Sequence, residues 1–265
     1  MKILLYLMVS VHLLYASVYY SKVEPFKIKN ISSDVSGKVL FCDENLIGKK
    51  LSKKAFIKID DVIDRAQLKD VVQKLQYAQE TLEINKKILT NLQEILKKKR
   101  VNYKKTEALK IKSRIDKDRE FYDLVTSENT LYATHKEINN LKSTIADLQL
   151  KKIELQKSIH DKKIIENGYV LYSIAVKEGE FVNKATPLAK VADTSKALLT
   201  IYVDAEILKG IDKRVVYIDD KKTNYRVSRV LDIADSVNIS KYKVQIVIKP
   251  PEIFSQLVKV ELKEE

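Results

Sequence analysis

The fold of this chain is decided between Asp61 and Asn167, a stretch that opens with DVIDRAQLKDVVQKLQYAQETLEINKKILTNLQEIL at residues 61–96. All five glycines and all four prolines of the 265-residue chain lie outside this stretch. Both residue types interrupt helices, so their absence over about a hundred residues predicts continuous helix.

Apolar residues repeat every seven positions within the stretch, in two separate registers. The first register consists of Leu68, Leu75, Leu82, Leu89 and Leu96, with Val71, Ala78 and Leu92 three residues further on. The second consists of Leu124, Leu131, Ile138, Ile145 and Ile159, with Leu141, Leu148 and Leu155 as companions. Sustained heptads of this kind form a narrow apolar seam and predict a coiled coil.

The heptads lapse between Lys97 and Arg119. Ser113 or Asp116 can cap a new helix in this segment, because their side-chain oxygens accept hydrogen bonds from the free N–H groups of a first turn. A turn at residues 108–116 gives two arms of about 45 to 50 residues, each about 70 Å long. Arms of equal length can close on each other, whereas a single unbroken rod is the alternative. We therefore predict an antiparallel helical hairpin over residues 61–166.

The segments on either side of the predicted hairpin resemble each other. Gly37 and Gly48 are eleven residues apart, and so are Gly168 and Gly179. Each copy opens with Gly-x-Val-Leu, at residues 37–40 and 168–171. Two copies with one ungapped spacing form an internal repeat, and each copy reads as short strands joined by glycine turns. The hairpin therefore interrupts a repeated β unit.

The remaining segment, residues 195–265, is rich in β-branched and alternating runs. Strands are predicted at residues 198–203, 214–218, 225–233, 242–248 and 257–262, with one helical turn at Ala205–Lys209. About five short strands within about seventy residues predict a small β-barrel or sandwich.

Charge and cysteine content restrict the functional classes. The formal net charge is +13 and 32% of residues are charged, which is typical of long solvated helices. A basic chain binds nucleic acid, an anionic membrane or an acidic protein. No zinc-finger spacing, helix-turn-helix pattern or aromatic RNA-binding motif supports a nucleic-acid partner. Cys42 is the only cysteine, so an internal disulfide is impossible, and we interpret it as a half-buried strand residue.

The N-terminus predicts export. Lys2 is followed by an apolar run from Ile3 to Ala16, which is the length of a secretory signal and too short to span a membrane comfortably. We expect a signal peptide at residues 1–16. An uncleaved anchor that reaches Tyr20 is the alternative.

Together, these features resemble the periplasmic adaptor, or membrane fusion protein, family of HlyD-type and efflux-pump adaptors. The half-motifs of a lipoyl-like domain are matched at residues 35–39 and 48–51, and again at 167–170, 178–182 and 187–188. The resemblance implies an α+β protein in which a coiled-coil hairpin at 61–166 is inserted into a lipoyl-like domain at 25–60 and 167–194. A β-barrel domain at 195–265 then follows. No single motif is specific, but the order of the motifs is.

The family resemblance also implies a function. It predicts a non-enzymatic adaptor in the periplasm, associated with the inner membrane, that links an inner-membrane transporter to an outer-membrane channel. Adaptors of this family form homo-oligomeric rings, so a trimer or a hexamer is expected. The cargo and the class of pump are not encoded in these motifs.

The resemblance further predicts which residues contact the channel. The hairpin tip of the family carries an Arg, a Leu four residues later and a Ser seven residues beyond that. These positions match Lys105, Leu109 and Asp116, so only the leucine is retained. Lysine keeps the charge but lacks the planar donor fork of arginine, and aspartate can still cap a helix. Residues 97–119 hold eleven Lys or Arg against three Asp or Glu, which suits an acidic partner or a solvated surface.

Two alternatives remain from the sequence. A true lipoyl or biotin carrier presents its modified lysine on a tight turn between the half-motifs, and here the coiled coil replaces that turn. A structural coiled-coil protein of the envelope shares the hairpin but does not explain the paired half-motifs. We find no catalytic constellation, cofactor motif or metal-ligand cluster, and expect His135 and His160 to lie on the surface.

Overall fold

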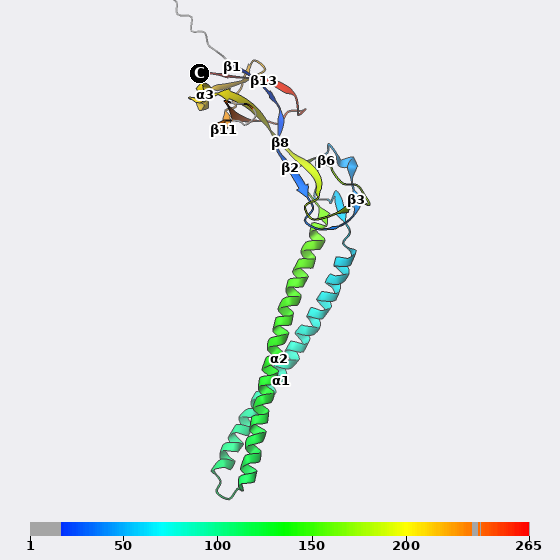
Figure 1. Ribbon diagram of the computed structural model, residues 1–265, viewed down its shortest axis with the longest axis vertical. Coiled ribbons are helices and arrows are strands. Elements are labelled where there is room, and N and C mark those ends of the chain that lie inside the picture. The colour runs from blue at the N-terminus through cyan, green and yellow to red at the C-terminus, as the bar shows by residue number, and fades with distance from the viewer. Residues whose placement is uncertain (1–16, 235–237, 239, 265) are drawn as a thin grey trace, which may run out of the picture.

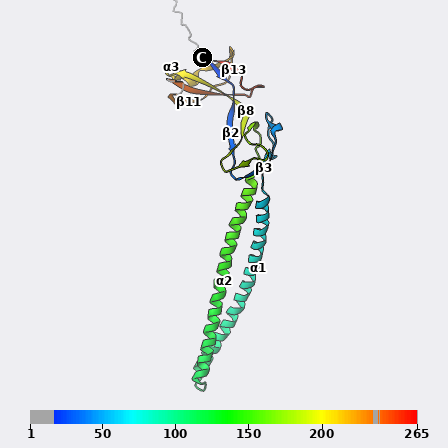
Figure 2. The same cartoon turned by 45° about the vertical axis from the view of Figure 1, so that its right-hand side comes forward.

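The computed structural model describes residues 17–234, 238 and 240–264. Two small β-domains lie at one end of an elongated molecule, and a long helical hairpin projects from them (Figure 1). The hairpin helices stay side by side when the molecule is turned (Figure 2). The predicted α+β class with a long helical hairpin is confirmed.

The hairpin consists of α1 (Val62–Ala108) and α2 (Arg114–Asp161), with 47 and 48 residues. The two predicted heptad registers supply the seam between them. Its buried apolar side chains are Val71, Leu75 and Leu96 on α1 and Ile138, Ile145 and Leu155 on α2. The hairpin was predicted to continue to residue 166, but α2 ends at Asp161 because β5 (Lys163–Ile164) pairs with β4 (Ile57–Ile59). The hairpin therefore grows out of an antiparallel strand pair.

The first β-domain combines segments from both sides of the hairpin. Its strands are β2 (Glu24–Ser32), β3 (Gly37–Cys42), β4, β5, β6 (Val170–Ile174), β7 (Phe181–Val182) and the first half of β8 (Pro187–Asp204). A 3₁₀ turn, η1, spans Glu44–Leu46. One apolar core is built from both segments, with Val39, Phe56 and Ile57 packed beside Leu171 and Val182. Neither segment can bury its apolar face without the other.

The two copies of the glycine repeat hold each other. The Gly179 N–H donates to the Val39 carbonyl at 2.8 Å, and the Gly48 N–H donates to the Leu171 carbonyl at 2.8 Å. Each copy thus closes its glycine turn on the opening strand of the other copy. Gly48 and Gly179 have φ angles of 80° and 89°, a left-handed conformation that other residues adopt only with strain.

The second β-domain contains β1 (Ser17–Lys22), the second half of β8, α3 (Ala205–Leu208) and a 3₁₀ turn, η2, at Ile211–Lys213. The strands β9 (Val215–Ile218), β10 (Lys221–Lys222), β11 (Val227–Ala234), β12 (Lys241–Ile248) and β13 (Leu257–Lys263) complete it. The five predicted strands and the helical turn are confirmed.

The predicted β-barrel needs correction. Within the described residues the strands run in the orders β1-β13-β9-β10 and β11-β12-β8-β2, and neither sheet closes on itself. Both sheets cover one core, in which Leu199 and Ile201 of β8 and Ile246 of β12 meet Val260 and Leu262 of β13. A two-residue strand, β10, ends the first sheet, so its edge is too short to continue the hydrogen-bonded ladder around the core.

The N-terminal segment of the described chain also differs from the prediction. Ser17–Lys22 forms β1 and pairs with β13, with Ser17 opposite Leu262 and Lys22 opposite Leu257. An anchor that reaches Tyr20 is therefore wrong, because Tyr20 is held in this ladder. The predicted signal peptide at 1–16 lies outside the described residues. No helix in the described part of the chain is both long enough and apolar enough to cross a membrane.

Candidate functional site at the hairpin tip

The tip is a five-residue loop between two capped helix ends. Leu109 leaves α1 in an extended conformation, with φ −79° and ψ 120°, and its N–H donates to the Thr106 carbonyl at 3.1 Å. At the other end, Ser113 is the N-cap of α2. Its Oγ accepts from the Asp116 N–H at 3.1 Å and donates to Asp116 Oδ2 at 2.8 Å. Both bonds fix the point at which the chain reverses, as the predicted cap at Ser113 requires.

All three residues predicted to contact a channel lie at this tip. Lys105 is exposed in the last turn of α1, and the side chain of Leu109 is 44% exposed at the start of the loop. Asp116 lies in the first turn of α2, and its carboxylate accepts a hydrogen bond from the hydroxyl of the N-cap residue Ser113. Asp116 is therefore a positioning residue for the loop, while Lys105 and Leu109 present their side chains outward.

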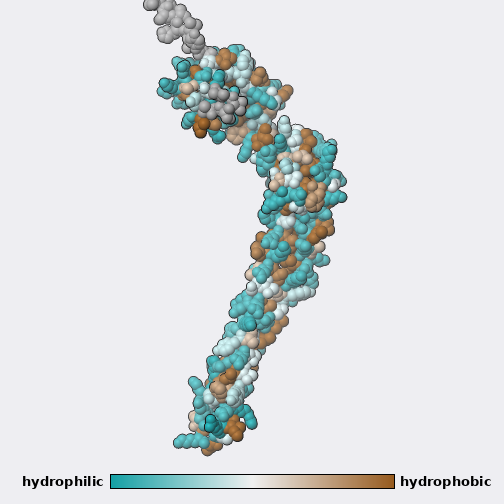
Figure 3. All heavy atoms as spheres, in the orientation of Figure 1, coloured by the Kyte–Doolittle hydropathy of each residue, from teal (hydrophilic) through white to brown (hydrophobic). Residues whose placement is uncertain are grey.

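Sequence reasoning missed the two most exposed apolar residues of the tip. Ile111 is 92% exposed in the middle of the loop, and Ile115 is 74% exposed in the first turn of α2. Apolar patches interrupt the hydrophilic surface along the shaft and at the tip (Figure 3). Both isoleucines fall outside the two heptad registers. Apolar residues at positions that cannot join the seam were the sequence feature that could have revealed them. Exposed apolar side chains clustered on a small loop are typical of a contact surface.

The cations near the tip divide into two groups. Lys99 binds Asp123 at 2.8 Å and Arg100 binds Glu128 at 2.7 Å, so these two join the helices across the seam. The cations nearest the loop are Lys105, Lys110, Lys112 and Arg114, and none forms an ion pair with a described residue. The outermost turn therefore presents a net positive surface around its isoleucines.

An ion pair that is largely shielded from solvent joins the two helices at the base of the hairpin. Asp64 in the first turn of α1 accepts from the Ser158 hydroxyl and lies 3.0 Å from Lys162 Nζ, just beyond α2. Burial opposes ionisation of Asp64, but the hydrogen bonds from Ser158 and Lys162 outweigh it and lower the pKa of this carboxyl. The side chains of Asp64 and Lys162 are only 17% and 10% exposed. This ion-pair clamp fixes the angle between the helices where they leave the first β-domain.

That angle matters because the hairpin is long. Helices of 47 and 48 residues reach about 70 Å. By simple leverage, a rotation of about 5° at the base moves a tip about 70 Å away by about 6 Å. A residue at the tip can therefore be placed accurately only if the base is rigid.

Comparison with solved structures identifies the architecture. MacA from Actinobacillus actinomycetemcomitans superposes with a TM-score of 0.72 at 16% identity, covering 94% of this chain and 79% of that one. The membrane fusion protein Spr0693 from Streptococcus pneumoniae R6 superposes with a TM-score of 0.65 at 11% identity. The match to Spr0693 covers 94% of this chain and 99% of that one. The fold is that of a membrane fusion protein.

A further solved structure has the same fold, and the low sequence identities limit what can be inferred about this chain beyond its fold. A MacA–MexA chimera that contains the α-hairpin domain of Pseudomonas aeruginosa MexA superposes with a TM-score of 0.68 at 14% identity, covering 95% of this chain and 83% of that one. No protein-family model and no curated protein matches the chain by sequence. At these identities the likeness establishes the membrane fusion protein fold, and the partners have to be argued from this chain's own surfaces.

The described residues contain no group of three or more His, Cys, Asp or Glu side chains that could hold a metal ion. His135 and His160 are exposed on α2, as the sequence predicted. Cys42 is a free, half-buried thiol at the end of β3.

Proposed function

We propose that this chain is a non-catalytic adaptor subunit of an export or efflux system, acting in the periplasm and linking an inner-membrane transporter to an outer-membrane channel. The observation that carries the proposal is the hairpin tip, where exposed isoleucines and unpaired cations lie about 70 Å from the β-domains. A purely structural coiled coil does not require exposed apolar and positively charged side chains at its tip. The membrane fusion protein fold supports the same reading.

The tip is suited to an acidic protein surface with an apolar centre. Ile111 and Ile115 supply the apolar contact, and Lys105 with its neighbouring cations supplies electrostatic attraction. Complementary charge of this kind speeds association and selects the partner, while apolar burial holds the complex. Leu109 is half exposed at the start of the same loop and is the residue that the channel contact is expected to bury.

The two copies of the glycine repeat form, in this proposal, the split lipoyl-like domain of the adaptor. A carrier domain needs a lysine on the turn between its halves. That position is occupied here by the connection from β4 to Val62 of α1 and from Asp161 of α2 to β5. No short turn remains to display a swinging lysine, so the carrier alternative is not favoured.

We further propose that the adaptor assembles as a homo-oligomeric ring, a trimer or a hexamer, through its hairpins. Val72, Gln76 and Gln79 of α1 line a groove with Gln149 and Ile153 of α2, which marks one face of the hairpin. A second set of exposed apolar residues lies on the opposite flank of α1 by helical geometry, namely Tyr77, Ile84, Ile88 and Ile95.

Two different apolar patches on opposite faces favour a ring over a closed dimer. In a head-to-tail ring, each subunit presents one patch to the neighbour on one side and the other patch to the neighbour on the other side. Gln149 is exposed in the groove, and Tyr77 is 56% exposed on the opposite flank. Gln76 and Gln149 line the same groove, so Tyr77 and Gln149 lie at about the same height along the hairpin.

Photo-cross-linking at the tip tests the channel contact. A benzoylphenylalanine at position 111 in the native host should form an adduct with a protein of the outer-membrane fraction, identified by mass spectrometry. Leu109→Asp should abolish that adduct without lowering the melting temperature, because Leu109 is half exposed. Ile63→Asp makes the same change at a 70% exposed site at the base of the hairpin, and should leave the adduct intact.

Preserved export by Leu109→Asp, or an adduct that is equally lost in Ile63→Asp, contradicts the tip assignment. For the ring, Tyr77→Cys and Gln149→Cys are combined in a Cys42→Ser background and oxidised. A ladder of trimers or hexamers supports head-to-tail assembly. A product no larger than a dimer contradicts it.

A further inference from the structure

The two β-domains are joined by two strands. β2 and β8 pair antiparallel and run together through the neck between the domains (Figure 1). Each domain has its own apolar core, and the two cores share no residue. On β8 the first core ends at Val191 and the second begins at Ala197. Along the other strand, Ile31 belongs to the first core and Val23, just before β2, to the second.

The segment between the cores has no buried side chain. We call it the waist, and it consists of residues 24–30 of β2 and 193–196 of β8, all of them exposed or half-buried. Even its apolar side chains, Phe26 and Ile28, are 41% and 52% exposed. The Phe26 ring is approached by a cation, Lys196, whose Nζ lies 5.7 Å from the ring centre. A segment with few buried apolar contacts has low local stability, so bending is concentrated there.

The strand pairing is irregular at the same place. Pro25 lies opposite Ala197 and Lys27 lies opposite Asp193. One β2 residue, Phe26, therefore faces three residues of β8. Extra residues on one strand interrupt the ladder and bend the strand, and hinges form at a few positions of this kind. The waist thus has the local geometry of a hinge.

Asp193 holds the extra residues of β8 in one conformation. Its Oδ1 accepts from the Ser195 N–H at 2.9 Å, which closes a turn two residues long. Hydrogen bonds from the Ser195 hydroxyl and N–H lower the pKa of Asp193 from its usual 3.8, and they outweigh the opposing effect of burial. The charge of Lys196 lowers this pKa further. The carboxylate is therefore ionised at neutral pH, and an ionised acceptor forms the stronger hydrogen bond.

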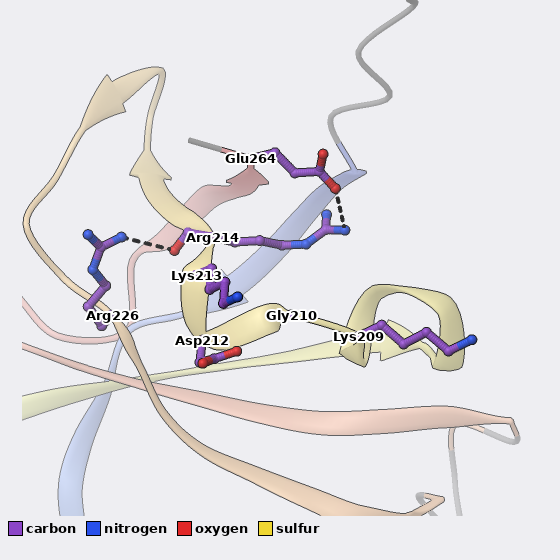
Figure 4. A pocket seen from close by; sticks show the side chains of 7 residues that line it. All are labelled: Lys209, Gly210, Asp212, Lys213, Arg214, Arg226 and Glu264. Carbon is purple, nitrogen blue, oxygen red and sulfur yellow. Dashed lines mark hydrogen bonds and ion pairs between the residues drawn. The ribbon is translucent and has the colours of Figure 1, made fainter.

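Both sides of the waist are held together by contacts of their own. Asp64 and Lys162, 3.0 Å apart, join the hairpin helices beside the first β-domain. In the second β-domain, Arg214 pairs with Glu264 at 3.2 Å, and Arg226 donates to the Arg214 carbonyl at 3.3 Å (Figure 4). These contacts tie the η2 turn to the end of β13 and to the segment before β11. A bend at the waist therefore moves two bodies that keep their own shape.

From these observations we infer that the waist is a hinge and that Asp193 fixes its angle. While the Asp193 turn is closed, the second β-domain keeps one orientation relative to the first β-domain and the hairpin. When the turn opens, the second β-domain rotates about β2 and β8. A rotation of about 5° moves a hairpin tip about 70 Å away by about 6 Å. The inference concerns the isolated chain, so it stands or falls independently of the adaptor role.

Distances between spin labels on the two β-domains test the inference. Labels are attached at Lys54→Cys in the first domain and Lys222→Cys in the second, both exposed positions, in a Cys42→Ser background. An excess of unlabelled protein removes distances between chains, and double electron–electron resonance gives the distribution. The otherwise native chain should show one narrow distribution. Loss of one hydrogen bond shifts a two-state equilibrium about five-fold, so Asp193→Ala should populate other distances about five-fold more.

Two variants separate the turn from a general effect of removing a carboxylate. Asp43→Ala is the matched control, because Asp43 Oδ1 accepts from the Asn45 N–H at 3.2 Å in the same kind of turn, but inside the first β-domain. It should leave the distribution between the domains narrow. Asp193→Asn keeps a carbonyl acceptor for the Ser195 N–H and should restore the native distribution.

Hydrogen exchange checks that the domains themselves stay folded. In Asp193→Ala, amide exchange should become faster at residues 194–196 and remain unchanged in β3 of the first domain and β13 of the second. An unchanged distance distribution in Asp193→Ala, or an equally broad one in Asp43→Ala, overturns the role of Asp193. Loss of protection throughout either β-domain overturns the hinge, because the domain and not the waist has then loosened.

Discussion

Replacing Asp64 with asparagine should destabilise the hairpin far more than the same change at another ion-paired aspartate of α1. Asp64 is 17% exposed and lies 3.0 Å from Lys162, whose side chain is 10% exposed. The substitution keeps the shape but removes the charge, so it leaves a nearly buried ammonium without a counter-ion. Hydrogen bonds to charged groups contribute about 1.5–3 kcal/mol, and we expect a loss of about 2–3 kcal/mol.

Asp70 provides the matched control. It lies 2.8 Å from Lys74, but the two side chains are 58% and 61% exposed. Exposed pairs one helical turn apart contribute about 0.3–0.5 kcal/mol, so Asp70→Asn should have almost no effect. Urea unfolding followed by far-ultraviolet circular dichroism measures both free energies. A cost for Asp64→Asn within about 0.5 kcal/mol of that for Asp70→Asn refutes the clamp.

A double substitution isolates the pairwise interaction. Lys162→Met in the Asp64→Asn background removes the stranded ammonium and should restore most of the lost free energy of unfolding. An additive result means that the two side chains do not act as a pair.

The same clamp predicts a pH dependence. Because the pKa of Asp64 is lowered from 3.8 in the folded chain, the ionised carboxylate stabilises the fold. This contribution is complete above the unfolded pKa and is lost as the pH falls through the lower folded pKa. The difference in free energy of unfolding between the native chain and Asp64→Asn should therefore stay constant from neutral pH down to about 5, and shrink at more acidic pH. A difference that grows on acidification contradicts the assignment.

Three further predictions concern the seam, the repeat and the tip. Leu96→Ala should cost about 2–4 kcal/mol because Leu96 is 4% exposed, whereas Ile95→Ala, at 46% exposure, should leave the free energy of unfolding nearly unchanged and weaken only assembly, measured by urea unfolding and sedimentation. Gly37→Ala should destabilise the first β-domain by about 1–3 kcal/mol, measured by thermal unfolding, because an added Cβ lies 2.7 Å from a buried methyl of Ile59. Ser113→Ala should cost about 1 kcal/mol and speed amide exchange in the first turn of α2, measured by hydrogen exchange, and unchanged protection there means that the cap is not formed in solution.

The hairpin was predictable because its determinants are local. The heptads that include Leu75 and Leu96 repeat every seven residues, which is close to two turns of a helix. The gap in the pattern coincides with the observed loop after Ala108. Ser113 indicated the start of α2 because its side chain caps the first turn of that helix. The equal spacing of Gly37–Gly48 and Gly168–Gly179 likewise predicted that two segments more than a hundred residues apart are equivalent.

The sheets were less predictable because strand pairing is not local. Short apolar runs identify strands, but a strand at Ser17–Lys22 becomes visible only when it pairs with Leu257–Leu262 at the far end of the sequence. The same applies to β8, whose first half pairs with β2 and β6 while its second half pairs with β12. The apolar run that precedes β1 resembles a membrane anchor that extends to Tyr20, so the sequence did not indicate a strand there.

The same difference between local and long-range determinants applies to the candidate site. Position along the helices placed Lys105, Leu109 and Asp116 at the tip, but sequence could not say that Asp116 is occupied by the cap while Ile111 is 92% exposed. Exposure depends on what the rest of the chain covers. The waist depends on long-range pairing in the same way, since β2 and β8 meet only in the folded chain.

The sequence by itself therefore determined the antiparallel hairpin, the position of its turn and the repeat that it interrupts. Those features arise from periodicity and from side chains that act on their own neighbourhood. Only the tertiary structure decided the pairing of β1 with β13, the open sheets in place of a barrel, the clamp at Asp64 and the waist around Asp193. Each of these joins residues far apart in the chain, and their free energy comes from contacts that exist only after folding.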